Sequence, residues 1–212
     1  MGRKTKITKE MILEAAYELL DEAGIGAVAI KSIAQKLDCS TQPISWQFGS
    51  MTELKKELLK YAGGRLYAAL PGKMEGHNAL KAFFISGVYY ITNACDHPKV
   101  FRFVNVDDPM ETIGEEFRGE GTIFSEQFNK YAVEQLCAAY PIDPEKIVET
   151  VRNAVIYTHG LAVMMIWDHF RMPKKEACRM TFDMGVTLLK EIGIEDLGFK
   201  FEDAYNDICG IN

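Results

Sequence analysis

The segment STQPISWQF, residues 40–48, concentrates side chains that make directional hydrogen bonds. Thr41, Gln42, Ser45 and Gln47 each carry both a donor and an acceptor, and the segment holds no charged residue. Glutamine can bond two edge atoms of adenine at once, and threonine can contact the methyl group of thymine. Because no carboxylate is present to repel phosphates, these residue types indicate recognition of base edges in DNA.

Helices must hold this segment at a surface. Apolar residues at spacings of four, three and four predict a helix over about 8–24, with Thr8 as its N-terminal cap and Gly24 at its end. The apolar stripe of that helix is Ile12, Ala16, Leu19 and Ala23. In the same way, Ser40 is expected to cap the helix that contains most of the polar segment.

Two short helices, at about 30–37 and 41–47, are separated by a tight turn and therefore predict a helix-turn-helix. In this motif the second helix enters the major groove of DNA. Ile44 and Phe48 are four residues apart and are expected to anchor that helix on a small core. Trp46 then faces the DNA, where its indole N–H can donate to a phosphate.

Charge is distributed unevenly along the 212 residues, whose net charge is −6. Residues 1–70 carry ten basic and eight acidic side chains, whereas residues 71–212 carry fourteen and twenty-two. Only the N-terminal third tolerates a polyanion. SMTE, residues 50–53, is a capping box that opens a fourth helix reaching about Leu70, and PG follows at 71–72. We therefore expect two domains, 1–70 and 71–212.

The remainder of the chain also follows helical periodicity, and strand signals are scarce, so the predicted fold class is all-α. The expected later helices are about 78–95, 98–105, 110–140, 144–170 and 174–192. Five dispersed cysteines and the lack of a signal peptide or membrane span favour a cytoplasmic protein.

Aromatic residues and methionines are frequent beyond residue 80. Most belong to a core, but apolar and aromatic side chains with a few polar groups also line ligand pockets. The candidate ligand-binding residues are Phe83, Tyr90, Phe103, Phe124, Phe128, Tyr157, His159 and Met164. His159 equally fits a satisfied buried histidine. Neither a metal site nor a cofactor motif is expected, since the Asp–His pairs are adjacent and do not share a helix face.

The stretch from Ile7 to Leu59 resembles the DNA-binding domain of tetracycline-repressor (TetR) family regulators. The residues that carry the resemblance are, in order, ILEAAYELLDEAG, IKSIAQKLDCS and ISWQFGSMTELKKELL. HPKVFRFV at 97–104 and YTHGLAVMM at 157–165 resemble a subgroup with HPxxF and HG patterns. The expected DNA-binding residues are Lys31, Ser40, Thr41, Gln42, Ser45, Trp46, Gln47 and Lys55.

The resemblance implies a homodimeric transcriptional regulator, more often a repressor, that binds double-stranded operator DNA and a small effector. The composition of the C-terminal part favours a mostly apolar effector, and binding would shift a hinge near 60–72. The helices near 144–170 and 174–192 would form the dimer interface, although their apolar positions fit a buried intrachain face equally well.

Three departures from the family pattern support an alternative function. Ser45, Gln47 and Met51 stand where the family usually has a tyrosine, a histidine and a lysine that hold DNA phosphates. A TetR-like sensor or interaction protein with weakened DNA binding is therefore the alternative. An enzyme is not expected, because the sequence holds no GxSxG, HExxH, P-loop or paired-carboxylate motif.

Overall fold

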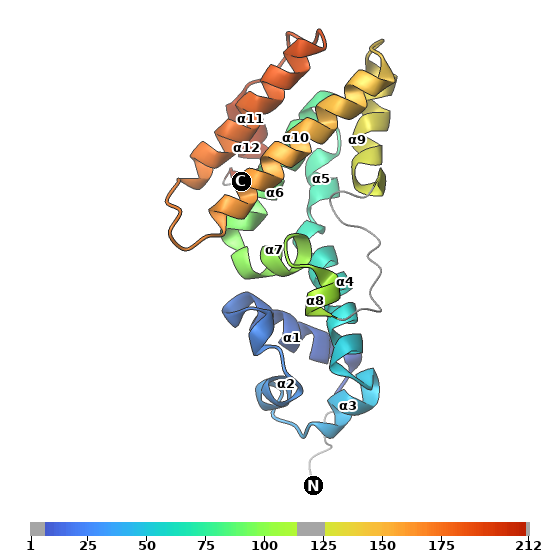
Figure 1. Cartoon of the computed structure of the whole chain (residues 1–212), viewed down its shortest axis with the longest axis vertical. Helices are drawn as coiled ribbons and strands as arrows, with labels where there is room; N and C mark the ends of the chain where they lie inside the picture. Colours follow the sequence, from blue (N-terminus) through green and yellow to red (C-terminus); the bar gives the residue numbers. More distant parts are fainter. Residues whose placement is uncertain (1–6, 114–125, 211–212) are drawn as a thin grey trace. The chain divides into compact units, whose positions relative to one another are not determined.

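The computed structural model describes residues 7–113 and 126–210, and every regular element within these ranges is helical (Figure 1). The all-α prediction is therefore confirmed. The described residues divide into two compact units, one made of 7–67 and 97–113 and the other of 68–96 and 126–210.

The first unit begins with the predicted helix α1 (Lys9–Ala23). The hydroxyl of Thr8 accepts a hydrogen bond from the amide of Met11 at 3.3 Å, which confirms the predicted cap. Gly24 ends the helix with φ of 84°, in the region that glycine adopts readily. The buried face of this helix differs from the predicted apolar stripe, because Leu19 is half-buried and Ala23 is exposed. The buried face consists of Ile12, Leu13, Ala15, Ala16, Tyr17 and Leu20.

The helix-turn-helix consists of α2 (Ile30–Lys36) and α3 (Gln42–Phe48), which follow a short 3-10 helix at Ile25–Ala27. The sequence pattern predicted Ser40 as the cap of α3, and this prediction is wrong. Thr41 holds the cap position with helical dihedral angles, and its side chain makes no capping hydrogen bond. A side-chain cap normally requires an extended residue there, so this helix begins without one.

Helix α4 (Met51–Tyr67) follows at once, and Ser50 caps it by accepting from the amide of Glu53 at 3.1 Å. The carboxylate of Glu53 binds Lys56 at 2.9 Å, so only one half of the predicted capping box is observed. The unit is completed by α7 (Pro98–Asn105) and α8 (Pro109–Thr112).

Helix α7 is attached to α1 and α4 by polar contacts. Nδ1 of His97 lies 3.3 Å from the carboxylate of Asp21, and Lys99 donates to the carbonyl of Glu22. The hydroxyl of Tyr67 donates to Asn105 at 2.9 Å. The helix also buries Val100, Phe101 and Phe103. Contacts between residues 76 and 77 positions apart thus bring α7 into the same unit as the helix-turn-helix.

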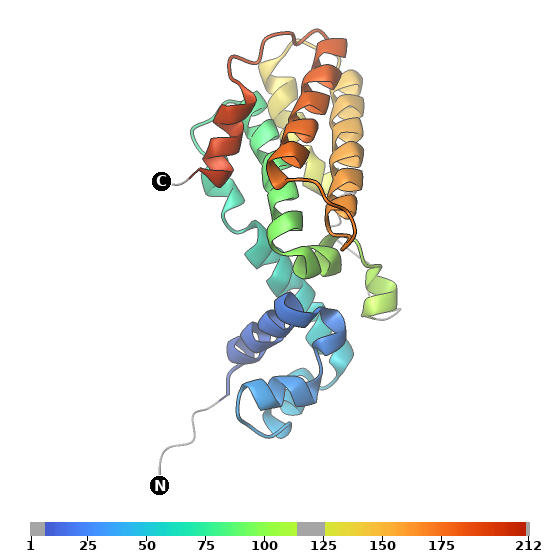
Figure 2. The same cartoon turned by 90° about the vertical axis from the view of Figure 1, so that its left-hand side faces the viewer.

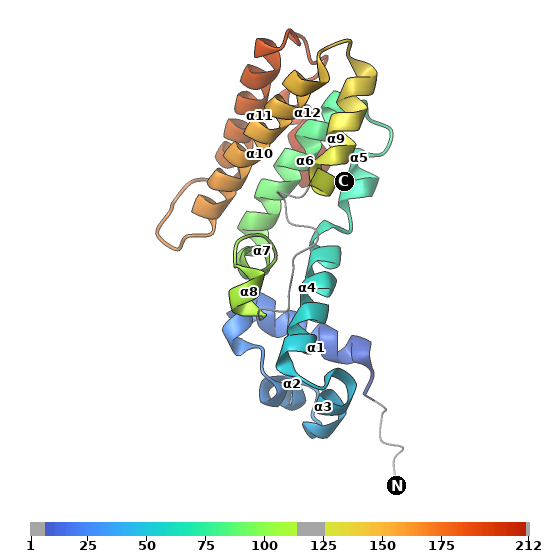
Figure 3. The same ribbon diagram turned by 45° about the vertical axis from the view of Figure 1, so that its right-hand side comes forward.

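The second unit is a helical bundle around α6 (Ala79–Asp96), which packs against α5 (Leu70–Met74), α9 (Glu126–Ala139), α10 (Pro144–Met165), α11 (Lys174–Glu191) and α12 (Phe201–Cys209) (Figure 3). Helices α10 and α11 lie side by side (Figure 2).

The contact between α6 and α11 is close because glycine stands at the crossing. A β-carbon at Gly185 would lie 2.7 Å from the ring of Phe84, so only glycine fits there without movement. The ring of Phe84 also lies 4.5 Å from that of Phe182, measured between centroids. Aromatic packing of this kind stabilises the unit beyond the burial of its apolar area. None of the described helices is long and apolar enough to cross a membrane.

Candidate nucleic-acid interface and ligand site

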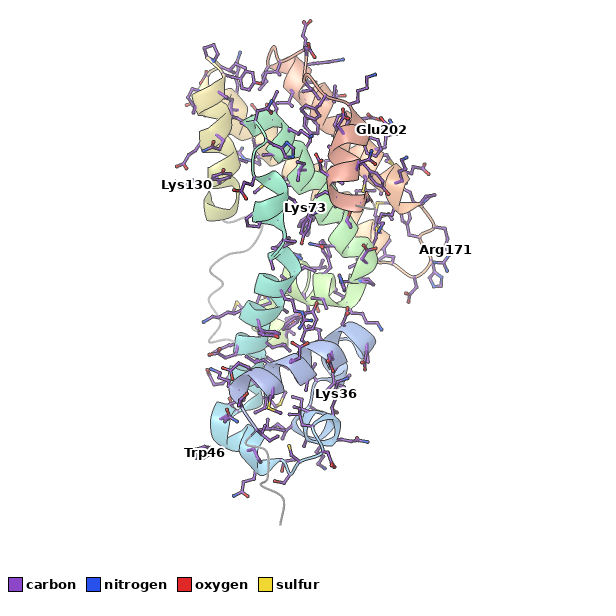
Figure 4. The ribbon with its side chains drawn as sticks, turned by 180° about the vertical axis from the view of Figure 1, so that it is seen from behind. Lys36, Trp46, Lys73, Lys130, Arg171 and Glu202 are labelled. Carbon is purple, nitrogen blue, oxygen red and sulfur yellow. The ribbon has the colours of Figure 1, made fainter. Side chains whose placement is uncertain are left out.

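Helix α3, called the recognition helix below, separates an apolar face from a polar one. Ile44 is fully buried and Phe48 is 7% exposed, so the predicted anchors hold the helix on the domain. Trp46 is 85% exposed, and in Figure 4 it extends away from the helices of its unit. An indole left this far in water is unusual, because its burial would be favourable by several kcal/mol, about 2–3. The indole of Trp46 is therefore accessible to an external partner.

The polar face of the recognition helix is uncharged. Thr41, Gln42 and Ser45 are exposed together with Trp46, and Ser40 precedes them at the surface. The free backbone N–H groups at the start of a helix favour anions, and this end carries no carboxylate that would oppose them. The arrangement can therefore approach a polyanion and offer donors and acceptors to base edges.

Gln47 has a different role from its neighbours. Its Nε2 donates to the carbonyl oxygen of Ile7 at 3.0 Å in a half-buried contact. Because this amide is engaged with the backbone at the start of the chain, its position is fixed by the fold. No sequence pattern indicates the contact, since the two residues are forty positions apart.

The lysines around the motif differ in their surroundings. Lys31 is exposed on α2 and has no hydrogen bond or salt bridge to another described residue. Lys55 donates to the carbonyl of Thr112 at 2.9 Å, so α4 holds α8 through it. Lys36 binds Glu18 at 2.9 Å and Glu22 at 3.1 Å, and the hydrogen bond with Glu18 is the main reason why its pKa is raised. Lys31 is therefore the lysine best placed to meet an external anion.

A polar cluster that sequence reasoning missed joins α1 to α4. Glu14 accepts hydrogen bonds from Tyr61 and Arg65, and the bond from Tyr61 is the main cause of its lowered pKa. The guanidinium of Arg65 lies 4.4 Å from the centre of the Tyr17 ring. The only sequence signal is the spacing of four between Tyr61 and Arg65, which places both on one helix face.

The residues predicted to bind a ligand do not all lie in the same unit. The hydroxyl of Tyr90 lies 2.8 Å from Nδ1 of His159, and burial lowers the pKa of that histidine. Tyr90 is buried, whereas Phe83 and Tyr157 are half-buried and Met164 is 37% exposed. These residues all belong to the second unit.

The remaining candidates lie elsewhere. Phe103 is buried in the first unit, on α7, because that helix docks on α1 and α4. Phe124 lies outside the described residues, and the side chain of Phe128 in α9 is not described either. The structure thus brings Tyr90 and His159 together in a direct contact.

Helices α2 and α3, with the exposed polar face of α3, form a helix-turn-helix, the motif whose second helix enters the major groove in DNA-binding proteins. Residues 12–58 match the family model of bacterial regulatory proteins, tetR family. The matched stretch, which runs from α1 into the first half of α4, is therefore similar to the DNA-binding domain of that family.

Solved structures share the fold of the chain. A TetR-like transcriptional regulator from Rhodococcus sp. RHA1 has a TM-score of 0.63 at 13% identity and covers 90% of this chain and 98% of its own. A TetR variant from Acinetobacter baumannii AYE in complex with minocycline has a TM-score of 0.58 at 15% sequence identity, and the match covers 90% of this chain and 99% of that one. TetR from the same organism has a TM-score of 0.53 at 16% sequence identity, and the match covers 88% of this chain and 99% of that one. No curated protein matches the chain.

Proposed function

We propose that this chain represses transcription in the cytoplasm as a homodimer, and that a small, mostly apolar effector releases it from operator DNA. The observation that carries the proposal is the recognition helix. Its polar face is exposed and uncharged, while Ile44 and Phe48 hold the opposite face in the core. That geometry suits insertion of α3 into the major groove.

The residues of the recognition helix would divide the work of binding. Thr41, Gln42 and Ser45 would meet base edges and so supply sequence preference. Trp46 would donate its indole N–H to a phosphate, and Lys31 would supply an ionic contact from α2. Phosphate contacts give affinity, whereas base contacts give specificity.

Exposed apolar side chains on α10 and α11 support the proposed dimer. Ile156 is 53% exposed, and Val148, Met164 and Met180 are 37%, 37% and 36% exposed. A second copy that covered these side chains would remove an apolar surface from water on both partners.

The proposed effector site centres on Tyr90 and His159. Burial lowers the pKa of His159 and so favours its neutral imidazole, which lies beside the hydroxyl of Tyr90. Neutral groups among aromatic side chains favour an uncharged, mostly apolar ligand. The HG pattern at His159–Gly160 and the HPxxF pattern at His97–Phe101 support a place in the subgroup that carries both.

Effector and operator would act on each other by linkage. A ligand that lowers affinity for DNA by some factor must itself bind more weakly to the DNA-bound protein by the same factor. Titration of the effector with and without operator, and of the operator with and without effector, would measure that factor twice.

The second candidate function is a sensor with weakened DNA binding. Two observations favour it, since the amide of Gln47 is engaged with Ile7 and the ammonium of Lys55 with Thr112. One donor of each group is then engaged inside the fold, and the side chain of Met51 carries no hydrogen-bond donor for a phosphate.

One experiment separates the two functions. Binding of the chain to the DNA upstream of its own coding sequence is measured at several salt concentrations, with unrelated DNA of equal length as the control. A repressor is expected to prefer the upstream DNA by about a thousandfold or more at physiological salt. A sensor would bind both DNAs equally weakly.

A further inference from the structure

Two thiols from different helices converge on one turn of α6. The carbonyl oxygen of Val88 accepts a hydrogen bond from the hydroxyl of Thr92 at 2.9 Å, and Sγ of Cys178 on α11 donates to the same carbonyl at 3.9 Å. Sγ of Cys209 on α12 lies 3.6 Å from the hydroxyl oxygen of Thr92. The two sulfur atoms are therefore held by two oxygen atoms that are themselves in contact.

The two thiols differ in their accessibility. Cys178 is fully buried, whereas Cys209 is half-buried and is the last residue of α12. Burial, and after it the charge of Cys209, raises the pKa of Cys178 to about 12, so Cys178 stays protonated at neutral pH. A dissolved oxidant therefore meets Cys209 first.

A cation belongs to the same cluster. Nζ of Lys174 on α11 binds the carboxylate of Asp96 at 2.8 Å. Burial acts to lower the pKa of Lys174, but the Asp96 carboxylate and the charge of Cys209 outweigh burial, so this pKa is raised. Because an ammonium group near a thiol favours the thiolate, Lys174 supports ionisation of Cys209.

We propose that Cys178 and Cys209 form a reversible disulfide when hydrogen peroxide oxidises the chain, which makes this cluster a redox modification site. The thiolate of Cys209 attacks one oxygen of the peroxide, the O–O bond breaks, and the released hydroxide takes up a proton and leaves as water. The sulfur of Cys178 then attacks the sulfenic acid, the S–O bond breaks, and the hydroxide leaves with the proton of Cys178 as a second water. Two thiols thus lose the two electrons that reduce the peroxide.

The position of Cys209 at a helix end lets the two sulfur atoms approach. A disulfide needs a sulfur–sulfur distance of about 2 Å, so the contact between Cys209 and Thr92 must open. The last turn of a helix opens locally at a small cost in free energy. In a reducing compartment such a bond is transient and reports oxidation. The reaction does not require DNA, so it goes beyond the proposed function.

Peptide mapping of the full chain tests the site. Trypsin cuts after lysine and arginine, so Cys95, Cys178 and Cys209 fall in three different peptides. Reduced protein is treated with hydrogen peroxide, its remaining thiols are blocked, and it is digested without reductant before mass spectrometry. The wild type is expected to yield one cross-linked pair of peptides, which contains Cys178 and Cys209 and which dithiothreitol separates.

Three variants accompany the wild type. Cys178→Ala and Cys209→Ser each remove one thiol and should abolish the cross-link, and in Cys178→Ala the sulfenic acid of Cys209 should persist and be trapped by dimedone. Cys95→Ser is the matched control, because Cys95 is half-buried on α6, three residues after Thr92, and this variant should form the cross-link in the wild-type yield. The map of the wild type remains decisive if Cys178→Ala unfolds.

Three results would overturn the inference. A cross-link between Cys209 and Cys95 would assign the reaction to another pair. A cross-link between two chains would show that the thiols react across molecules. A Cys209 that stays reduced, or that proceeds to sulfinic acid while Cys178 stays free, would show that the two thiols do not meet.

Discussion

The hydroxyl of Tyr90 on α6 lies 2.8 Å from Nδ1 of His159 on α10, and this contact joins two helices of the second unit. Burial lowers the pKa of His159 from its ordinary value of 6.5. The unfolded chain therefore takes up the proton at a higher pH than the folded chain does. Stability contributed by this site is complete above pH 6.5 and declines as the pH falls toward the folded pKa.

The loss of stability at low pH gives the first prediction. His159→Gln can still accept a hydrogen bond from Tyr90 but does not titrate. Between about pH 7.5 and pH 5, the melting temperature of the variant is expected to fall less than that of the wild type. Thermal unfolding followed by circular dichroism across this range makes the comparison. Parallel curves would show that His159 contributes nothing to the acid sensitivity of the fold.

The second prediction separates binding from stability on the recognition helix. Trp46→Ala changes a side chain that is 85% exposed, so the free energy of unfolding should stay within about 0.5 kcal/mol while DNA affinity falls. Ile44→Ala, the control, empties a fully buried position and should cost about 2–5 kcal/mol of stability. Chemical denaturation and operator titration of both variants provide the data. Unaltered DNA affinity in Trp46→Ala would remove the indole from the interface.

The third prediction concerns the start of α4. Met51 is the first residue of that helix, where backbone N–H groups and the helix dipole favour a phosphate. Met51→Lys is expected to steepen the log–log salt slope of operator binding by about 0.9 per half-site, with little change in sequence preference. If the slopes of variant and wild type coincide, α4 does not meet the DNA backbone there.

The fourth prediction tests the proposed dimer. Ile156→Asp and Met180→Asp place a charge on exposed apolar positions of α10 and α11, where the fold of a single chain tolerates it. Sedimentation is expected to show monomers for both variants under conditions where the wild type is a dimer. Lys190→Asp adds the same carboxylate at an exposed polar position of α11 and should remain dimeric. Dimers in all three variants would place the interface elsewhere.

Local patterns in the sequence predicted much of the first unit. Thr8, Gly24 and Ser50 mark helix ends because caps act within one turn, and the spacing of Ile44 and Phe48 predicted their burial. The predicted cap of α3 was wrong, because Thr41 has helical dihedral angles and no extended residue holds the cap position.

Contacts between distant residues were beyond local patterns. Nothing near position 97 in the sequence indicates that His97 meets Asp21, so the place of α7 in the first unit could not be predicted. The engagement of Gln47 with Ile7 is of the same kind, since both residue types fit several roles. For the ligand site, aromatic content indicated many candidates, and only packing distinguishes Tyr90 and His159 from Phe103.

Reading of bases by the recognition helix is the central claim, and selection of bound sequences from a random DNA library tests it most directly. The wild type is expected to enrich a sequence with two related half-sites. Gln42→Ala should enrich the same sequence but lose discrimination at one or two base pairs in each half-site, by about 1–3 kcal/mol. An identical preference in both proteins, or no enriched sequence for the wild type, would contradict the claim.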